Sequence, residues 1–267
     1  MSPAGEVRPP AVAGSFYPGA ARELADEVDA LLEGVPGCGG VPIRGLVAPH
    51  AGYVYSGPVA ASAYACLAAD RRPGRVVIAG LSHFVPLRGL AVTGASAWRT
   101  PLGDVAIDEA GRKALVAAGA VIDDTPHHAE HSIEVQLPFL QRCCPGVPVL
   151  PVAVGHGSPI EAADILGAAL GDDAVLVVST DLSHYHDAVT ARRLDTRTAA
   201  AVEALELGAV GPDDACGADP LRAAMAWAAA HGYRVELLDL RSSADTAGDP
   251  SRVVGYGAFT IHAGHGA

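Results

Sequence analysis

The chain has 267 residues, of which 50% are hydrophobic and 18% are charged, a composition typical of a globular protein with a sizeable core. Its net charge is −12, and Lys113 is the one lysine among its 18 basic residues, so it has no basic stripe for nucleic-acid phosphates. No apolar run approaches the ~18 residues of a membrane span, and the amino-terminal segment lacks the pattern of a secretion signal. We therefore expect a cytoplasmic protein that binds neither nucleic acid nor membranes.

The first half of the chain alternates helical and strand patterns. An extended arm at 7–17 is followed by an amphipathic helix at 21–33, in which Leu24, Val28 and Leu31 recur at helical spacing. A glycine-rich turn leads into a strand at 43–48, and Gly57 and Pro58 open an alanine-rich helix that ends near residue 69. The β-branched run at 75–80 predicts a second strand, covered on both faces.

The second half continues this alternation and defines the fold class. Helices are predicted at 130–142, 159–170, 190–207 and 220–231, and strands at 147–154, 174–179, 234–240 and 253–261. Short strands that alternate with helices are typical of an α/β fold. We predict a single three-layer α/β domain over residues 1–267 with a mostly parallel central sheet, to which the last two strands add antiparallel pairing.

Five cysteines are an odd number without framework spacing, so reduced thiols are expected: Cys38, Cys66, Cys143, Cys144 and Cys216.

Histidine is more informative, because several of the 11 histidines directly follow apolar strand patterns. The carboxyl ends of parallel strands line the ligand crevice of such folds, so His50, His83 and His184 are expected to converge there. Clustered imidazoles suit metal binding or proton transfer.

Several motifs along the chain resemble the Memo family, whose bacterial members are called AmmeMemoRadiSam system protein B. The matching segments run from the arm to the last strand: Ala13-Gly14-Ser15-Phe16-Tyr17, Ala48-Pro49-His50-Ala51-Gly52-Tyr53 with Ser56-Gly57, Gly80-Leu81-Ser82-His83, Glu130-His131-Ser132-Ile133-Glu134, Ser179-Thr180-Asp181-Leu182-Ser183-His184, Cys216-Gly217 and Gly255-Tyr256-Gly257-Ala258-Phe259-Thr260-Ile261-His262. The family is similar in fold to the class III extradiol ring-cleavage dioxygenases, which hold non-heme iron with two histidines and a glutamate. Its members' own reaction is not settled.

The resemblance implies a set of roles. His50 and His83 match the two histidine ligands, and Cys216 stands where the dioxygenases place their glutamate. His184 matches the acid/base histidine. Asp181 could accept a hydrogen bond from the ring N–H of His184 and fix its tautomer, or it could equally cap the following turn. One divalent or redox metal ion is therefore expected, iron first, although a thiolate also favours copper or zinc. A helix start near Pro220 would stabilise the thiolate of Cys216.

Three further residues are candidates for contacts with substrate or with the ligands. His131 and Glu134 share one face of the helix predicted at 130–142, and the resemblance places this segment along the cleft. Tyr53 is expected to flank the pocket, as is Tyr55, with aromatic core packing as the alternative reading of both.

His127-His128-Ala129-Glu130-His131 contains the H-x-x-E-H pattern of inverzincin zinc peptidases, which is a competing hypothesis. Pro126 directly precedes it, which puts His127 in an irregular first turn, so we expect the match to be accidental. A third hypothesis is a non-enzymatic module that binds a metal or a ligand. The substrate is expected to be an unidentified small molecule or peptide, and the family name implies a radical-SAM protein as pathway partner.

Overall fold

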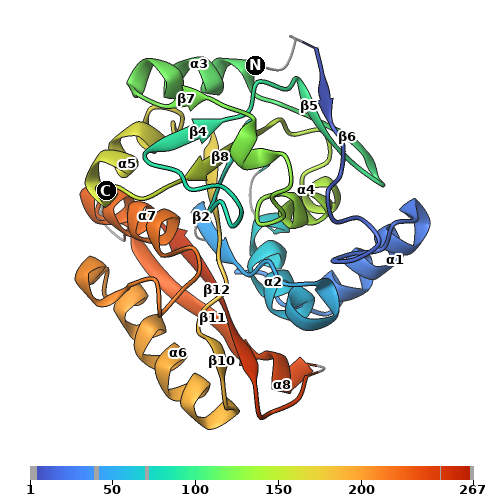
Figure 1. The fold of residues 1–267 in the computed structure, drawn as a ribbon, viewed down its shortest axis with the longest axis vertical. Coiled ribbons are helices and arrows are strands. Elements are labelled where there is room, and N and C mark those ends of the chain that lie inside the picture. Colours follow the sequence, from blue (N-terminus) through green and yellow to red (C-terminus); the bar gives the residue numbers. More distant parts are fainter. Residues whose placement is uncertain (1–4, 39–41, 70–71, 247, 265–267) are drawn as a thin grey trace.

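The computed structural model describes residues 5–38, 42–69, 72–246 and 248–264. Within them, a nine-stranded sheet forms the centre of the molecule (Figure 1). Its strands follow in the spatial order β10 (His184–His186), β12 (Val253–His262), β2 (Ile43–Ala48), β9 (Ala174–Ser179), β3 (Arg75–Gly80), β8 (Val149–Val154), β4 (Leu90–Val92) and β7 (Val121–Ile122), and β11 (Arg234–Ser242) also pairs with β12.

The sheet is mixed. Its centre, β2-β9-β3-β8, is parallel, whereas β12 pairs antiparallel with β2, β10 and β11, and β4 pairs antiparallel with β8. The central strands are buried along almost their whole length, as the continuous apolar runs predicted. The predicted α/β class with covering helices is confirmed, and antiparallel pairing occurs on both sides of the parallel centre, while β7 at one edge pairs parallel with β4.

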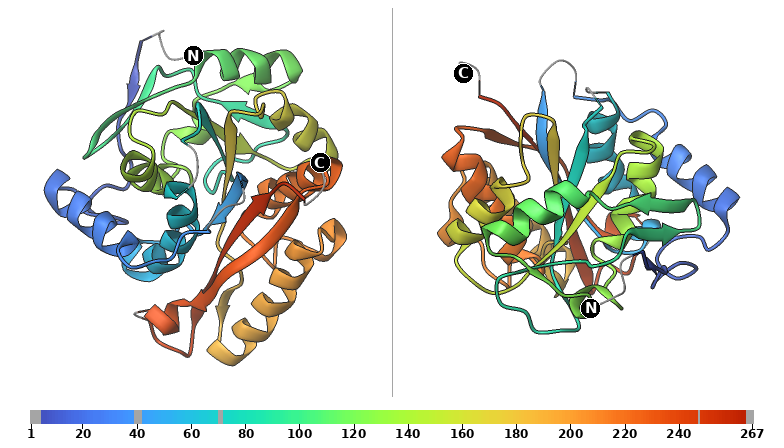
Figure 2. Two further views of the ribbon diagram at one scale, coloured as in Figure 1. Left: turned by 180° about the vertical axis from the view of Figure 1, so that it is seen from behind. Right: turned by 90° about the horizontal axis from the view of Figure 1, so that it is seen from above.

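Helices cover both faces of the sheet (Figure 2). On one side α1 (Ala21–Leu32), α2 (Tyr53–Ala68) and α4 (Leu137–Cys143) contact one another, and on the other α5 (Pro159–Gly167) packs on α7 (Ala218–Ala230) and α3 (Glu109–Ala118). The long helix α6 (Ala188–Glu203) packs on β11 and β12. The remaining elements are the small sheet β1 (Val7–Arg8), β5 (Ala97–Thr100) and β6 (Gly103–Ala106), the short helix α8 (Ser243–Thr246), and the 3₁₀ turns η1 (Thr125–His127), η2 (Glu134–Gln136) and η3 (Leu207–Ala209).

Two helix predictions need correction. Helix α2 begins at Tyr53 rather than at Gly57. Gly57 lies inside the helix, where a Cβ atom would meet Leu31 of α1, so this glycine marks the close packing of two helices and not a helix start. The helix predicted at 130–142 is a turn, then η2, and only then α4. Its first residues are not helical because the Glu130 carboxylate accepts hydrogen bonds from the amides that follow it.

The expectation that all thiols are reduced is wrong for two cysteines. A disulfide joins Cys38, in the turn after α1, to Cys66 of α2, whereas Cys143, Cys144 and Cys216 are free. Cys66 is therefore not a simple packing residue. Of the helices that the structure describes, none is both long and apolar enough to cross a membrane.

Candidate metal centre

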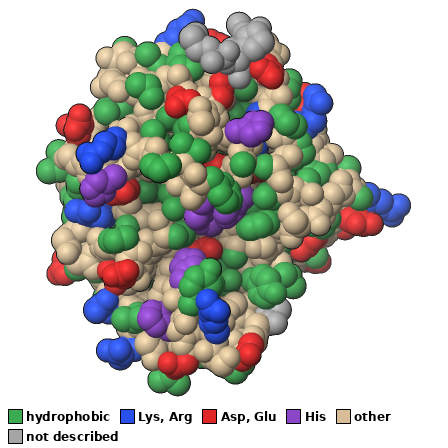
Figure 3. All heavy atoms as spheres, in the orientation of Figure 1, with side chains coloured by type: hydrophobic (Ala, Val, Ile, Leu, Met, Phe, Trp, Pro, Cys, Tyr) green, Lys and Arg blue, Asp and Glu red, His purple; other side chains and the backbone are tan. Residues whose placement is uncertain are grey.

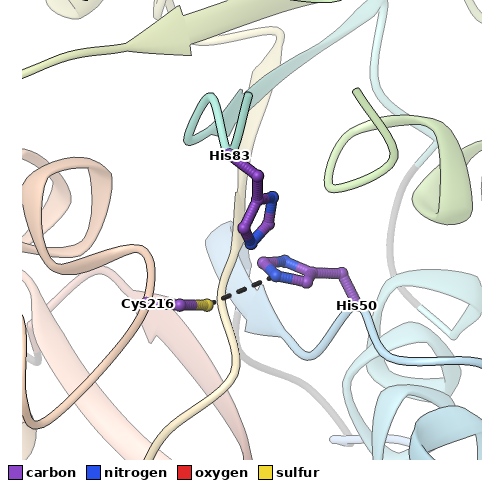
Figure 4. Close-up of side chains that lie close together, drawn as sticks. All are labelled: His50, His83 and Cys216. Atoms are coloured by element: carbon purple, nitrogen blue, oxygen red, sulfur yellow. Dashed lines mark hydrogen bonds between the residues drawn. The ribbon is translucent and has the colours of Figure 1, made fainter. Parts of the chain in front are cut away.

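Three side chains from distant parts of the chain meet at the carboxyl ends of the central strands. His50 follows β2, His83 follows β3, and Cys216 lies just before α7. One donor atom of each lies within 4.8 Å of those of the other two. Figure 4 shows the two imidazoles and the thiol pointing toward one another, with Cys216 Sγ 3.3 Å from His50 Nε2.

The surrounding hydrogen bonds fix which ring nitrogen of each histidine faces this group. His50 Nδ1 lies 3.0 Å from Ser179 Oγ. The Ser179 hydroxyl donates its hydrogen to the carbonyl oxygen of Ser132, so Ser179 Oγ accepts the hydrogen bond from His50 Nδ1. His83 Nδ1 lies 2.9 Å from Glu130 Oε1 and donates to it. Both Nε2 atoms therefore keep a free lone pair, the arrangement that metal-binding histidines show when an outer partner holds the other nitrogen.

The electrostatics of the group suit a cation. Burial and the neighbouring His83 lower the pKa of His50 to about 3, so its imidazole is neutral and can act as a ligand. Burial and the Asp181 carboxylate raise the pKa of the Cys216 thiol to about 12, which outweighs the effect of the nearby helix start. The prediction that the start of α7 stabilises the Cys216 thiolate is therefore wrong for the protein without a metal, in which the thiol stays protonated at neutral pH. A bound cation would supply this stabilisation, and the amide of Asp181 already lies 3.3 Å from the sulfur.

These donors fit a single metal ion. Two neutral imidazoles and one thiolate are a common donor set for zinc, copper and iron, and three protein ligands leave coordination positions open. The group also opens onto a cavity of about 1040 Å³, and Figure 3 shows histidine side chains gathered in a hollow on this face.

The residues predicted to transfer protons, His184 and Asp181, both line this cavity, but the expected hydrogen bond between their side chains is not formed. His184 lines the cavity, outside the described groups of clustered metal donors, and its Nδ1 lies 2.7 Å from the carbonyl of Leu182. The carboxylate of Asp181 instead accepts from the amide of His50 at 2.7 Å. The interpretation of Asp181 as the partner that orients His184 is therefore wrong, because Leu182 occupies that position.

The other candidates are divided between the cavity and the core. His131 lines the cavity and is stacked on His83 with ring centroids 4.4 Å apart, and Phe16 of the amino-terminal arm packs against His131 at a tilt, with centroids 4.6 Å apart. Burial and the neighbouring His50 lower the pKa of His131 to about 4. Tyr53 is a core residue whose hydroxyl donates to Val135, so the packing alternative holds for it, whereas Tyr55 lines the cavity.

Glu134 anchors the amino-terminal arm instead of facing the cavity. Its carboxylate is fully buried, pairs with Arg8 at 2.6 Å, and accepts hydrogen bonds from the amides of Ala11 and Val12 and from the Tyr17 hydroxyl. His131 and Glu134 therefore do not act on one face, because the segment is not the continuous helix that was predicted. The anchored arm places Phe16 at the cavity.

Glu130 was expected in the Memo-like segment along the cleft and in the competing zinc-peptidase pattern, but without a role of its own in the metal site, and it organises the candidate centre. Its buried carboxylate accepts from the amide and Nδ1 of His83 and from the amides of His131 and Ser132. Burial alone would raise the pKa of Glu130, but these hydrogen bonds outweigh it and lower the pKa to about 2. Glu130, His83 and His131 could also hold a cation, but four N–H groups already occupy the carboxylate.

His127, the first residue of the H-x-x-E-H pattern, lies elsewhere. Its buried ring packs edge-on against Trp98, and its Nε2 lies 3.2 Å from the carbonyl of Ala91. Among the described residues, neither group of clustered metal donors includes it. The arrangement therefore lacks the two-histidine ligand set of an inverzincin.

The fold and this donor group define an α/β protein with a candidate His/His/Cys metal site at the strand ends. A family model described as "Memo-like protein" matches residues 8–260, and the chain belongs to this family. MEMO1 family proteins of Methanothermobacter thermautotrophicus, Methanopyrus kandleri and Aeropyrum pernix are 36%, 38% and 35% identical to it, over 94–96% of this chain and 98–100% of theirs. These three relatives are archaeal.

A solved structure supports the fold. The crystal structure of the uncharacterized protein JW3007 from Escherichia coli K12 matches with a TM-score of 0.55 over 80% of this chain and 99% of that chain. The two sequences are 13% identical, so the likeness concerns the fold alone.

Proposed function

We propose that this Memo-family protein is a metal-dependent oxygen or redox enzyme. His50, His83 and Cys216 hold one metal ion, with iron as the first candidate and copper or zinc as the alternatives. The substrate is a small molecule or a peptide segment that enters the cavity beside these residues. A radical-SAM protein is the proposed partner in the same system.

The observation that carries the proposal is the convergence of three donor atoms within 4.8 Å at an open cavity. A purely structural metal site is normally closed by four protein ligands, whereas a catalytic site keeps a position for substrate. The bonds of Ser179 and Glu130 to the outer nitrogens of His50 and His83 support the same interpretation.

The chain's own residues divide the work between holding and proton transfer. Ser179 and Glu130 orient the two imidazoles, and the amide of Asp181 donates toward the sulfur of Cys216. His184 serves as the acid or base that exchanges a proton with the substrate, while the Leu182 carbonyl holds its Nδ1–H. When bound, the metal supplies Lewis-acid or electron-transfer chemistry at its open positions.

Elemental analysis and oxygen-uptake measurements on protein purified without oxygen test this function. One iron ion per chain, together with oxygen uptake that occurs only when a cell extract containing candidate substrates is added, supports an oxygen-dependent enzyme. A bound metal without any turnover would instead favour a non-enzymatic metal- or ligand-binding module. A peptidase activity lost in His127→Ala would favour the zinc-peptidase hypothesis.

A further inference from the structure

Tyr256 is a buried residue at the wall of the cavity, and the protein leaves its hydroxyl without a partner. The residue is 1% exposed, and its hydroxyl makes no hydrogen bond within the part of the chain that the structure describes. Other buried tyrosines all have one: Tyr17 donates to Glu134, Tyr53 to Val135 and Tyr64 to Gln136. Tyrosine hydroxyls in the interior normally find a partner, and the partner of Tyr256 must come from the cavity that this residue lines.

The position of Tyr256 in the sheet explains what its side chain faces. Residues two apart on a strand point to the same face, and Val254 and Tyr256 of β12 both line the cavity of the candidate metal centre. Val254 pairs with His184, and the neighbouring Gly255 exchanges backbone hydrogen bonds with Leu182 and Ser183. Tyr256 is thus held beside the segment that carries His184.

The surroundings of Tyr256 keep its hydroxyl protonated. Burial, reinforced by the nearby Asp181 carboxylate, raises the pKa of the Tyr256 phenol above its usual range. The phenol is therefore a hydrogen-bond donor at neutral pH. The amide of Asp181 lies 3.3 Å from the sulfur of Cys216, and Asp181 and Tyr256 line the same cavity.

We infer that the Tyr256 hydroxyl is a ligand-binding group, which donates a hydrogen bond to an acceptor atom of the molecule that occupies the cavity. The inference rests on the proposed metal function, since that molecule binds next to His50, His83 and Cys216. The molecule that Tyr256 binds is a small anion or an oxygen-bearing compound, because a phenol donates hydrogen bonds to such acceptors. The missing protein partner is then explained, because the ligand completes the hydrogen bond of Tyr256.

Azide is a suitable probe because it is a small anion that binds to metals at open positions and accepts hydrogen bonds. The experiment compares wild type, Tyr256→Phe and Tyr233→Phe, each loaded with cobalt(II) and first analysed for bound metal. We expect equal metal content in all three and an azide dissociation constant about 10-fold higher in Tyr256→Phe, as for the loss of one hydrogen bond to a charged group. Tyr233→Phe is the control, a tyrosine that packs on Trp227 away from the residues lining the cavity, and its azide affinity should stay within about twofold of wild type.

Melting temperatures give a second measurement that does not depend on azide. Tyr256→Phe should melt at the wild-type temperature, because its hydroxyl has no protein partner, whereas Tyr53→Phe should melt lower through loss of the bond to Val135. Equal azide affinity in Tyr256→Phe and wild type, no azide binding by metal-loaded wild type, or a melting loss as large as that of Tyr53→Phe would each overturn the inference. Wild type that binds no metal would instead overturn the proposed function and, with it, the role of Tyr256.

Discussion

Glu130 offers a quantitative test of how the candidate centre is built. Its buried carboxylate accepts hydrogen bonds from His83, His131 and Ser132, and its pKa falls from the usual 4.5 to about 2. This lowering corresponds to about 3 kcal/mol of stability, present above pH 4.5 and lost as the pH falls through 2. Glu130→Gln resembles the protonated side chain, so it should remove this contribution at pH 7.

Urea unfolding of the metal-free protein measures the effect. The free energy of unfolding of Glu130→Gln should be about 3 kcal/mol below wild type at pH 7, and the difference should narrow to about 2 kcal/mol at pH 3.5. Glu33→Gln changes an exposed glutamate at the end of α1 and should stay within about 0.5 kcal/mol of wild type. A difference for Glu130→Gln below about 1 kcal/mol, or one that does not change with pH, would refute the reasoning.

Three other predictions follow from the same contacts. His127→Ala should leave the bound metal unchanged, because its ring packs on Trp98; loss of metal in elemental analysis would revive the peptidase hypothesis. His184→Ala should retain the metal while substrate-dependent oxygen uptake falls by about 10²–10⁴, the usual contribution of a general acid or base, and a loss of metal would make it a ligand. Arg8→Met leaves the Glu134 carboxylate buried and unpaired, so urea unfolding should show a loss of about 3–5 kcal/mol; a loss below about 1 kcal/mol would show that water reaches this carboxylate.

The central strands and the meeting of His50 and His83 could be predicted because both follow from local patterns. Continuous apolar runs such as β3 and β9 are typical of parallel strands covered on both faces, and their carboxyl ends must share one edge. The outer strands β4, β7 and β10 are only two or three residues long, which is too short for a periodic pattern. The partner and the direction of each of these strands depend on tertiary contacts.

The roles of Glu130, Glu134 and Tyr256 could not be predicted because they depend on distant partners. The Glu130-x-x-x-Glu134 spacing favours one helix, but the carboxylate of Glu130 binds the following amides and ends the helical pattern. The partner of Glu134 is Arg8, 126 residues away, and no local pattern indicates it. Similarly, the Cys38–Cys66 disulfide depends on the turn after α1 folding back onto α2.

The metal content of matched variants tests the central claim most directly. Wild type, His50→Ala, His83→Ala and Cys216→Ala would be purified without oxygen, equilibrated with iron(II), and analysed for metal per chain, with His127→Ala as the control. We predict one ion per chain in wild type and in the control, and metal affinity at least about 10–100-fold weaker in each of the other three variants. Equal metal content in all five proteins would contradict the assignment of His50, His83 and Cys216 as the metal site.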